Sequence, residues 1–287
     1  MATAVTAVPK ELIVAAVQYR ANDGRAVGAR TSPMNSLPSP SSPADDGSRG
    51  LPATGSRVTM ATMVRNATRR GTLSADRIVA ECLAMLDERG PSGLTFRKIG
   101  ARLGVDPTAL YRHFRSKDEL ILAIMDHLIE QALDGFTESD DWRDTIRDLL
   151  QRSRAVYLAH PHAAVLGTIR VTRRDGEMRI VEIILGALEL AGFTGEQAAR
   201  LYRVLDDLNL AFGSLDAGFR ILDEEQQAKD QGAWSREYAV LDASRFPRIA
   251  RATAYLPLID EDSTFALALD LTIEAIAARA AALPTSQ

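Results

Sequence analysis

Residues 94–120 contain three helix-start patterns in close succession, and this arrangement limits the fold more than any other feature of the chain. Thr95 precedes a short segment that stops at Gly104. Threonine caps the free N–H groups of a helix start, and glycine readily takes the left-handed conformation of a helix end. Asp106 and Pro107 then mark a new start, because aspartate is a good cap and proline suits the first helical position. The pattern predicts two short helices separated by a tight turn, and the second is expected to begin at Pro107 and to carry Leu110, Tyr111 and Phe114.

A third helix start follows this pair, and an earlier helix precedes it. Ser116 and Glu119 have the spacing of a capping box, in which each side chain satisfies a free backbone N–H. This helix is expected to extend to about Leu133, whereas Ser74 caps the earlier helix and Gly90 ends it. The apolar residues of these helices can form a small core and leave one polar face exposed. Together they indicate a helix-turn-helix.

Positive charge is concentrated on this part of the chain, although the whole protein is acidic. The net charge of the 287 residues is −4 at pH 7. Residues 65–118 carry 11 Lys and Arg against 6 Asp and Glu, whereas residues 119–287 carry 17 against 28. Such segregation is typical of a protein that presents one basic surface to the phosphates of a nucleic acid.

The order of residues in the motif is similar to that of a known family. The strings LTFRKIGARLGV, PTALYRHF and SKDEL follow one another within residues 94–120. The sequence from about Ser74 to Leu133 closely resembles the DNA-binding domain of the tetracycline-repressor (TetR) family of one-component transcriptional regulators. This resemblance implies a sequence-specific, dimeric repressor that leaves a palindromic double-stranded DNA operator when a small-molecule effector binds.

The resemblance places the second motif helix in the major groove of DNA. Arg112 can form two hydrogen bonds with a guanine edge, and Lys117 lies at a helix start, where free N–H groups favour a phosphate. Tyr111 either offers its hydroxyl to a phosphate or belongs mainly to the core, and His113 is either a DNA contact or a surface cap. An ordinary solvated side chain is the alternative for Lys117. The predicted DNA contacts are Thr95, Arg97, Pro107, Thr108, Ala109, Tyr111, Arg112, His113 and Lys117.

The predicted fold class is all-α, with an N-terminal three-helix helix-turn-helix domain and a larger helical ligand-binding and dimerisation domain. Apolar residues recur at three- and four-residue spacing in residues 142–159, 177–191, 195–222 and 264–282. Thr194 and Gln197 have the spacing of another capping box at the start of 195–222. The long stripe in 195–222 suits a helix bundle or a dimer interface. Residues 223–262 are rich in Asp, Glu, Gln and Arg, and we expect them to form a long loop that is either disordered or functional.

The second half of the chain resembles, more loosely, the C-terminal domain of the tetracycline repressors. The resemblance rests on Asp141-Trp142-Arg143, residues 157–161, Ala191-Gly192-Phe193-Thr194, Phe246-Pro247 and Leu269-Asp270-Leu271. It implies that the helices of 195–222 and 264–282 pair with their copies in a homodimer. It also implies a pocket whose ligand moves the helix from Lys117 to Leu133. The candidate pocket residues, all polar or aromatic, are Tyr157, His160, His162, Arg170, Tyr202, Asp206, Asn209 and Phe212.

Three segments are predicted: an extension in 1–70, the helix-turn-helix domain in 71–133 and the ligand-binding and dimerisation domain in 134–287. Residues 1–70 are rich in Ser, Pro, Gly and Ala, so disorder is expected there. Arg65, Arg69 and Arg70 form a basic arm at the end of this extension. Met60 and Met63 offer later starting points for the chain, and a genuine extension is the alternative.

Composition excludes several other classes of protein. The single cysteine, Cys82, rules out an intramolecular disulfide and fits a reducing cytoplasm. No apolar stretch approaches the roughly 18–20 residues of a membrane span. We find no nucleophile–base pairing, metal-ligand spacing or cofactor loop, so an enzyme is poorly supported and neither metal nor cofactor is expected. A dimer that binds nucleic acid without sequence preference is a further alternative.

Overall fold

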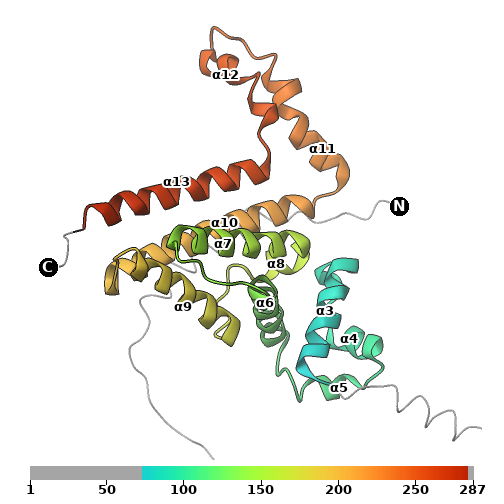
Figure 1. Cartoon of the computed structure of the whole chain (residues 1–287). Helices are drawn as coiled ribbons and strands as arrows, with labels where there is room; N and C mark the ends of the chain where they lie inside the picture. The colour runs from blue at the N-terminus through green and yellow to red at the C-terminus, as the bar shows by residue number, and fades with distance from the viewer. Residues whose placement is uncertain (1–72, 284–287) are drawn as a thin grey trace, which may run out of the picture. The chain divides into compact units, whose positions relative to one another are not determined.

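The computed structural model describes residues 73–283, and every regular element in this range is a helix (Figure 1). The all-α prediction is confirmed for this range, while the extension in 1–70, its basic arm and the two candidate start methionines lie outside it. No helix in 73–283 has both the length and the apolar character needed to span a membrane. The elements are α3 (Ala75–Arg89), η2 (Pro91–Gly93), α4 (Phe96–Leu103), α5 (Pro107–Leu110), α6 (Lys117–Leu133), α7 (Trp142–Ala159), α8 (Pro161–Gly167), α9 (Asp175–Leu190), α10 (Gly195–Arg220), α11 (Glu224–Ala233), η3 (Trp234–Tyr238), α12 (Pro247–Ala252), η4 (Leu256–Leu258) and α13 (Glu261–Ala281).

The predicted caps begin the first four α-helices of the described chain. The side chains of Ser74, Thr95, Asp106 and Ser116 each accept a hydrogen bond from a backbone N–H of the helix that follows. The capping box at α6 differs in one respect, because the Glu119 carboxylate accepts from the N–H of Arg115 and not of Ser116. Local side-chain chemistry therefore sets where these helices begin.

Two apolar cores hold the helices together. The first lies among α3, α4, α5 and α6, and it contains Leu86, Ile99 and Phe114. It continues into the second half of the chain through Tyr157 of α7 and Ala164 of α8. The second core lies among the end of α6 and helices α7, α9, α10 and α13. Because the first core crosses from one half of the chain to the other, α6 is packed directly against α7 and α8, and α3 is packed against α8.

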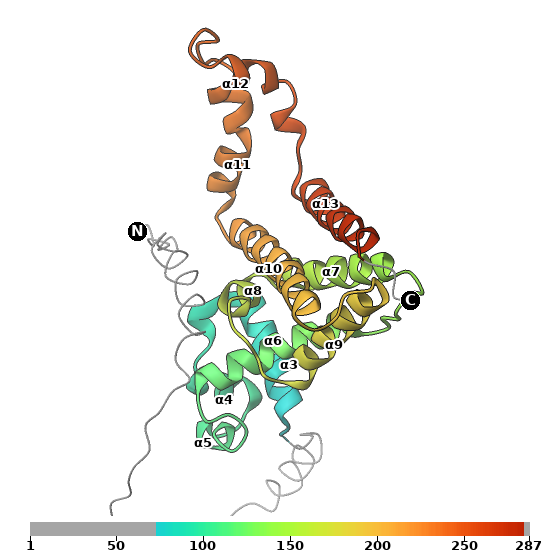
Figure 2. The same cartoon turned by 90° about the vertical axis from the view of Figure 1, so that its left-hand side faces the viewer.

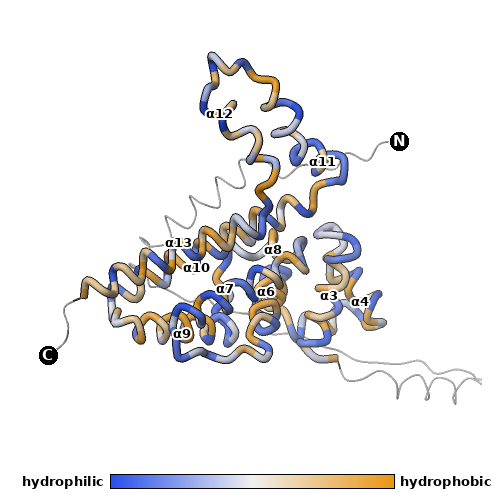
Figure 3. The backbone as a smooth tube through the Cα atoms, turned by 45° about the horizontal axis from the view of Figure 1, so that its top comes forward, coloured by the Kyte–Doolittle hydropathy of each residue, from blue (hydrophilic) through white to orange (hydrophobic). Residues whose placement is uncertain are grey.

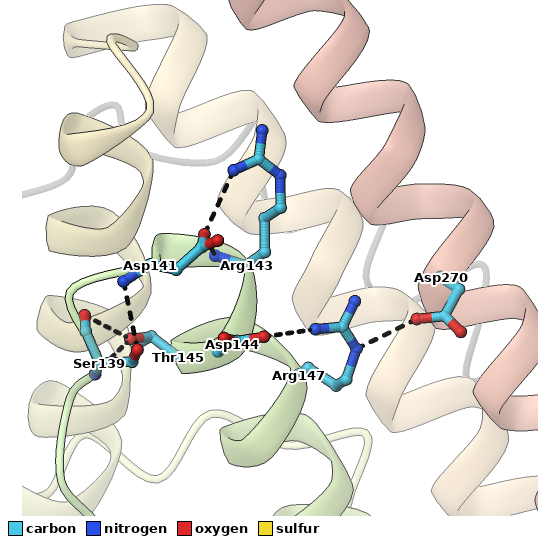
Figure 4. Close-up of polar contacts among 7 residues, drawn as sticks. All are labelled: Ser139, Asp141, Arg143, Asp144, Thr145, Arg147 and Asp270. Atoms are coloured by element: carbon cyan, nitrogen blue, oxygen red, sulfur yellow. Dashed lines mark hydrogen bonds and ion pairs between the residues drawn. The ribbon is translucent and has the colours of Figure 1, made fainter.

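The last helix, α13, is held against α7 by arginine–aspartate pairs as well as by apolar contacts. Arg147 Nε of α7 donates to Asp270 Oδ1 of α13 at 3.1 Å, and its Nη1 donates to Asp144 at 2.8 Å (Figure 4). Seven residues further along α7, Arg154 Nη1 lies 2.7 Å from Asp262 Oδ1. The two pairs indicate that α7 and α13 run antiparallel, since the partner moves back along α13 as the arginine moves forward along α7.

The prediction of a long loop in 223–262 is wrong, because this segment contains α11, η3, α12 and η4. We call residues 222–260 the arm. It leaves the end of α10 and returns to the start of α13 (Figure 2). No residue of its four helical elements is buried, and α11 is largely hydrophilic (Figure 3). A segment without a buried apolar stripe gives no helical periodicity, which is why the pattern did not reveal its helices.

Two other local predictions also need correction. The expected helix from Pro107 to Phe114 is regular only to Leu110, and the chain continues through hydrogen-bonded turns. The side chain of Thr194 caps no backbone N–H of α10, and Gly195, the first residue of that helix, has a positive φ of 55°. The apolar stripe of α10 is partly covered within this chain, and Leu215 remains 71% exposed.

Candidate nucleic-acid interface

The turn between α4 and α5 is tight because Gly100 lets the chain pass close to α4. A β-carbon on Gly100 would lie 2.9 Å from the carbonyl oxygen of Val105, which is closer than carbon and oxygen can approach. The N–H of Val105 donates to the Gly100 carbonyl at 2.9 Å, and Gly104 takes the left-handed conformation with φ 67°. This geometry fixes the angle at which α5 leaves the turn.

Thr108 is held in place by the residue that caps α5. The carboxylate of Asp106 accepts from the Thr108 backbone N–H at 2.8 Å and from its hydroxyl at 2.6 Å. These hydrogen bonds, that of the hydroxyl first, lower the pKa of Asp106 below its usual value. Because the exposed Thr108 hydroxyl donates its proton to Asp106, only its lone pairs remain available to another partner. It can accept from a base amino group but cannot also donate.

Two aromatic residues near the end of this segment have different environments. Phe114 is 2% exposed and belongs to the first core. Tyr111 is 56% exposed, and its ring meets that of Phe96 edge to face with centroids 4.6 Å apart. Of the two interpretations of Tyr111, the structure favours an exposed side chain braced by α4, with its hydroxyl outside the core.

Three of the predicted DNA-contacting side chains are exposed and uncommitted. Arg97, Arg112 and Lys117 are exposed, and their side chains form no hydrogen bond or ion pair with any residue in 73–283. Arg102, on the same helix as Arg97, behaves differently, since it is bound by Glu81 at 2.5 Å and by Glu88 at 2.6 Å. Arg102 therefore joins α4 to α3, whereas the other three cations are available to a ligand.

The remaining predicted contacts lie on the same short stretch. Pro107, Ala109 and His113 are half-buried. Thr95 is exposed, but its hydroxyl already accepts from the Lys98 N–H at 3.3 Å. The stretch from α4 to the start of α6 thus combines exposed cations with small and hydrogen-bonding side chains over a closed apolar core. Such a surface can follow phosphates and contact base edges.

Three of the candidate pocket residues contact α3, the glycine that ends it, or α6. His160 Nδ1 lies 2.8 Å from Asp87 Oδ2 of α3, and a β-carbon on Gly90 would lie 3.3 Å from the His162 ring. Arg170, beyond α8, binds the Asp118 carboxylate of α6 through two hydrogen bonds of 2.6 and 3.0 Å. We call these contacts the clamp. Their spacing of 52 to 73 residues leaves no local pattern, so the roles of the two aspartates could not be predicted from the sequence.

The other pocket candidates lie on α7 and α10. Tyr157 is 4% exposed, and burial first, then the charges of Asp206 and Glu177, raises its pKa. Asn209 is also 4% exposed, and its Oδ1 has no hydrogen-bond partner among the described residues. Phe212 is half-buried against Phe265, with ring centroids 5.5 Å apart. Tyr202 and Asp206 are half-buried on the same helix as Asn209. An unsatisfied buried amide oxygen is costly, so Asn209 suits a polar partner from outside the chain.

A tight turn between two short helices, with a basic exposed face over an apolar core, defines a helix-turn-helix DNA-binding protein. Comparison with known proteins agrees with this class. Residues 78–124 match the family model of bacterial regulatory proteins of the tetR family, and residues 135–280 match the tetracyclin repressor-like C-terminal domain. The chain therefore belongs to the tetR family and is a DNA-binding regulator of transcription.

The individual proteins that the chain resembles share less than a third of their residues with it over the aligned regions. A helix-turn-helix transcriptional regulator of Saccharopolyspora erythraea is 31% identical over 121 residues, which is 42% of this chain and about half, 51%, of that protein. The class A tetracycline repressor of transposon 1721 from Escherichia coli is 28% identical over 214 residues, covering 72% of this chain and 92% of the repressor. The TetR family protein ActR of Streptomyces coelicolor, crystallised with actinorhodin, has the same fold, with a TM-score of 0.64 at 24% identity over 73% of this chain and 99% of ActR. These named relatives are regulators and not enzymes.

Proposed function

We propose that the protein is a dimeric, cytoplasmic repressor that binds a palindromic operator and leaves it when a small-molecule effector occupies the domain in 134–287. The observation that carries the proposal is the exposed, uncommitted set of Arg97, Arg112 and Lys117 beside the turn of the motif. The tetracycline repressor, a relative over most of its length, supports the repressor role. In this proposal the helix-turn-helix domain occupies residues 71–133, and the chain has no catalytic activity.

The direct test is selection of DNA fragments from a random pool by the purified protein, followed by binding to the selected sequence at a stated salt concentration. A palindromic consensus is expected, because each subunit of a two-fold dimer reads one half-site. A dimer that binds all DNA equally would instead give no consensus and would leave only the charge-driven interaction.

Arg112→Ala is expected to relax the preference at one base position, since a bidentate contact is worth about 1–3 kcal/mol of discrimination. Lys117→Ala is expected to weaken binding to all sequences and to reduce the salt dependence by about one unit, because it removes one phosphate contact. Arg248→Ala is the matched control, since Arg248 is an exposed arginine on α12 that forms no hydrogen bond or ion pair with any residue in 73–283. If Arg112→Ala and Lys117→Ala bind like Arg248→Ala, this surface is not the DNA interface.

The dimer in this proposal forms through α10 and α13. These helices expose Val204 (52%) and Leu215 (71%) on the former and Leu267 (61%) and Leu271 (57%) on the latter. Large apolar side chains at this spacing suit a helix–helix interface between copies. Leu215→Glu is expected to shift the mass measured by light scattering from dimer to monomer at micromolar concentration, whereas Val240→Glu, an equally exposed change in the arm, should leave the dimer intact.

Effector binding must reach the DNA-binding surface through contacts between the two halves of the chain, and the clamp provides them. We propose that Tyr157, Tyr202, Asp206, Asn209 and Phe212 line the effector site, while His160, His162 and Arg170 pass the change to α3 and α6. A coupling of about 1–3 kcal/mol is enough to change operator affinity 5- to 150-fold. Tetracycline is a reasonable first compound for an operator-release assay, given the named relative. In that assay Asn209→Leu should abolish release by an active compound and retain operator binding.

A further inference from the structure

The arm borders an open cavity whose lining includes none of the proposed effector residues. The cavity has a volume of about 720 Å³ and lies between the end of α10, the arm and the start of α13. Its apolar wall includes Phe219 of α10, Trp234 of η3 and Leu256 of η4. Trp234 is half-buried, and its ring lies against that of Tyr238 with centroids 4.2 Å apart. This volume is in the range of pockets that hold drug-sized molecules.

The polar wall of the cavity is strongly acidic. It contains the carboxylates of Asp230, Asp260, Glu261 and Asp262, and Arg220 is the single cation among the lining residues. Arg220 is directed in part to the protein itself, since its Nη1 donates to the Leu158 carbonyl at 3.2 Å. The lining therefore has an excess of three negative charges, in contrast to the mixed charges elsewhere on α13.

A buried arginine next to the cavity does not neutralise this excess. Arg154 Nη1 lies 2.7 Å from Asp262, but its Nε also donates to Asp216 Oδ2 at 2.8 Å. Asp216 is 5% exposed, so its full charge must be balanced by that same arginine. One positive charge thus serves two carboxylates. Glu261 has no hydrogen-bond partner among the described residues. Burial first, then the charge of Asp216, raises its pKa, and the smaller effects of Arg220 and Arg154 lower it.

We propose that this cavity binds an organic cation with an aromatic or aliphatic body. The faces of Trp234 and Phe219 contact the body of such a ligand, and cation–π attraction adds to the contact. The negatively charged Glu261 carboxylate in the cavity wall attracts the positive charge of the ligand. A ligand of the same shape with a negative charge meets repulsion instead, so charge decides which molecules bind. The lining of the cavity includes none of the proposed effector residues on α7 and α10 and none of the predicted DNA contacts.

The test uses two ions of nearly equal size and opposite charge, tetraphenylphosphonium and tetraphenylborate, titrated calorimetrically into the full-length protein without DNA. The phosphonium is expected to bind with one site per chain and the borate at least tenfold more weakly, because each 1.4 kcal/mol of difference is a factor of ten. Equal binding of the two ions would show only a nonspecific apolar surface and would overturn the proposal.

Glu261→Gln is the decisive variant, and it should weaken phosphonium binding by about tenfold through loss of one charge. Glu224→Gln is its matched control, because Glu224 also lies in the first turn of a helix but does not line the cavity. Circular dichroism confirms that both variants are folded. If Glu261→Gln binds the phosphonium as the wild type does, the cation is not held by this wall.

Tryptophan fluorescence gives a second measurement at the same site. Trp234 lines the cavity, whereas Trp142 is 6% exposed in the second core. Phosphonium binding should therefore change the emission of the wild type and of Arg112→Ala equally, and it should leave Trp234→Phe unchanged. The Arg112→Ala result separates this proposal from the repressor function, because that variant tests DNA recognition alone. An emission change retained in Trp234→Phe would place the ligand elsewhere.

Discussion

The side chains of helices α3–α10 and those of the arm are buried to very different degrees. In the former, each of the main α-helices buries a stripe of side chains, and fully buried residues such as Leu86, Ile99 and Leu149 join one helix to the next. In the arm, no residue of α11, η3, α12 or η4 is buried, although Tyr255 (68%) and Leu258 (77%) are large and apolar.

This difference in burial shows which part of the chain is stabilised by its own packing. Packed helices are stable because their apolar faces leave water, and isolated short helices without such burial are marginal. The helices α3–α10 therefore hold the DNA-binding surface in one geometry, whereas the arm gains stability only from what it contacts at its ends or from a bound partner. The first two predictions compare a buried group in the first region with a related exposed group at or near the arm, and the last two concern the first region alone.

The largest effect is expected at Arg154, which has one buried and one exposed partner. Asp216→Asn leaves a buried guanidinium without its main counter-charge and should reduce the free energy of unfolding by about 3–5 kcal/mol. Asp262→Asn removes a carboxylate that is 78% exposed and should cost less than about 1 kcal/mol. Urea denaturation at one protein concentration measures both. Equal losses for the two variants would mean that burial does not distinguish the partners.

A slightly smaller effect is expected from truncation in the first core. Leu86 is 0% exposed on α3, so Leu86→Ala should lower the free energy of unfolding by about 2–5 kcal/mol through lost burial and the cavity left behind. Tyr255→Ala in the arm should stay within about 0.5 kcal/mol, as is usual at exposed sites. A cost above 1 kcal/mol at Tyr255 would show that the arm is covered in solution, and it would narrow the contrast between the two regions.

The same contrast explains how much of the fold could be predicted. Helix starts at Ser74, Thr95, Asp106 and Ser116 could be located because a cap is a contact between neighbouring residues, which the sequence records directly. The arm could not, because its helices bury no stripe. Thr194 shows the limit of cap patterns, since its side chain caps no backbone N–H of α10 despite the capping-box spacing.

The candidate site could be predicted only in part for a related reason. Residues 94–120 are contiguous, and their arrangement as two helices around a glycine turn follows from their order. The contacts of Arg170 with Asp118 and of His160 with Asp87 join residues far apart in the chain. Such pairs depend on how α8 packs against α3 and α6, and no spacing rule encodes this packing. The sequence accordingly contains no indication that His160 and Arg170 bind these two aspartates.

The reactivity of Cys82 tests the closure of the first core without changing its composition. Burial, with a smaller contribution from the charge of Glu81, raises the pKa of the Cys82 thiol to about 12. A raised pKa keeps the thiol protonated at pH 8, and the thiolate is the reactive form. Alkylation by iodoacetamide at pH 8 should be slow in the native protein and fast in urea. Mass spectrometry follows the alkylation with time. Fast labelling of the native protein would mean that the α3–α6 core opens readily.

The smallest effect on stability, and the most informative for regulation, is expected at the exposed pair Asp118–Arg170, whose side chains are 56% and 39% exposed. Asp118→Asn should cost about 0.2–1 kcal/mol of stability at neutral pH, as is usual for exposed pairs. The hydrogen bond from Arg170 lowers the pKa of Asp118. A lowered pKa in the folded state means that the pair contributes fully above the usual aspartate pKa of about 4 and loses its contribution as the pH falls below it.

This variant separates a connecting role from a merely stabilising one. If the clamp transmits the effector signal, Asp118→Asn should change the effector concentration needed for operator release more than it changes operator affinity without effector. The matched control is Glu130→Gln, which removes a similarly exposed pair, with Arg179, further along the same helix α6. Identical release curves for Asp118→Asn, Glu130→Gln and the wild type would contradict transmission through this contact and would leave the packing of Tyr157 and Ala164 in the first core as the route between the two halves.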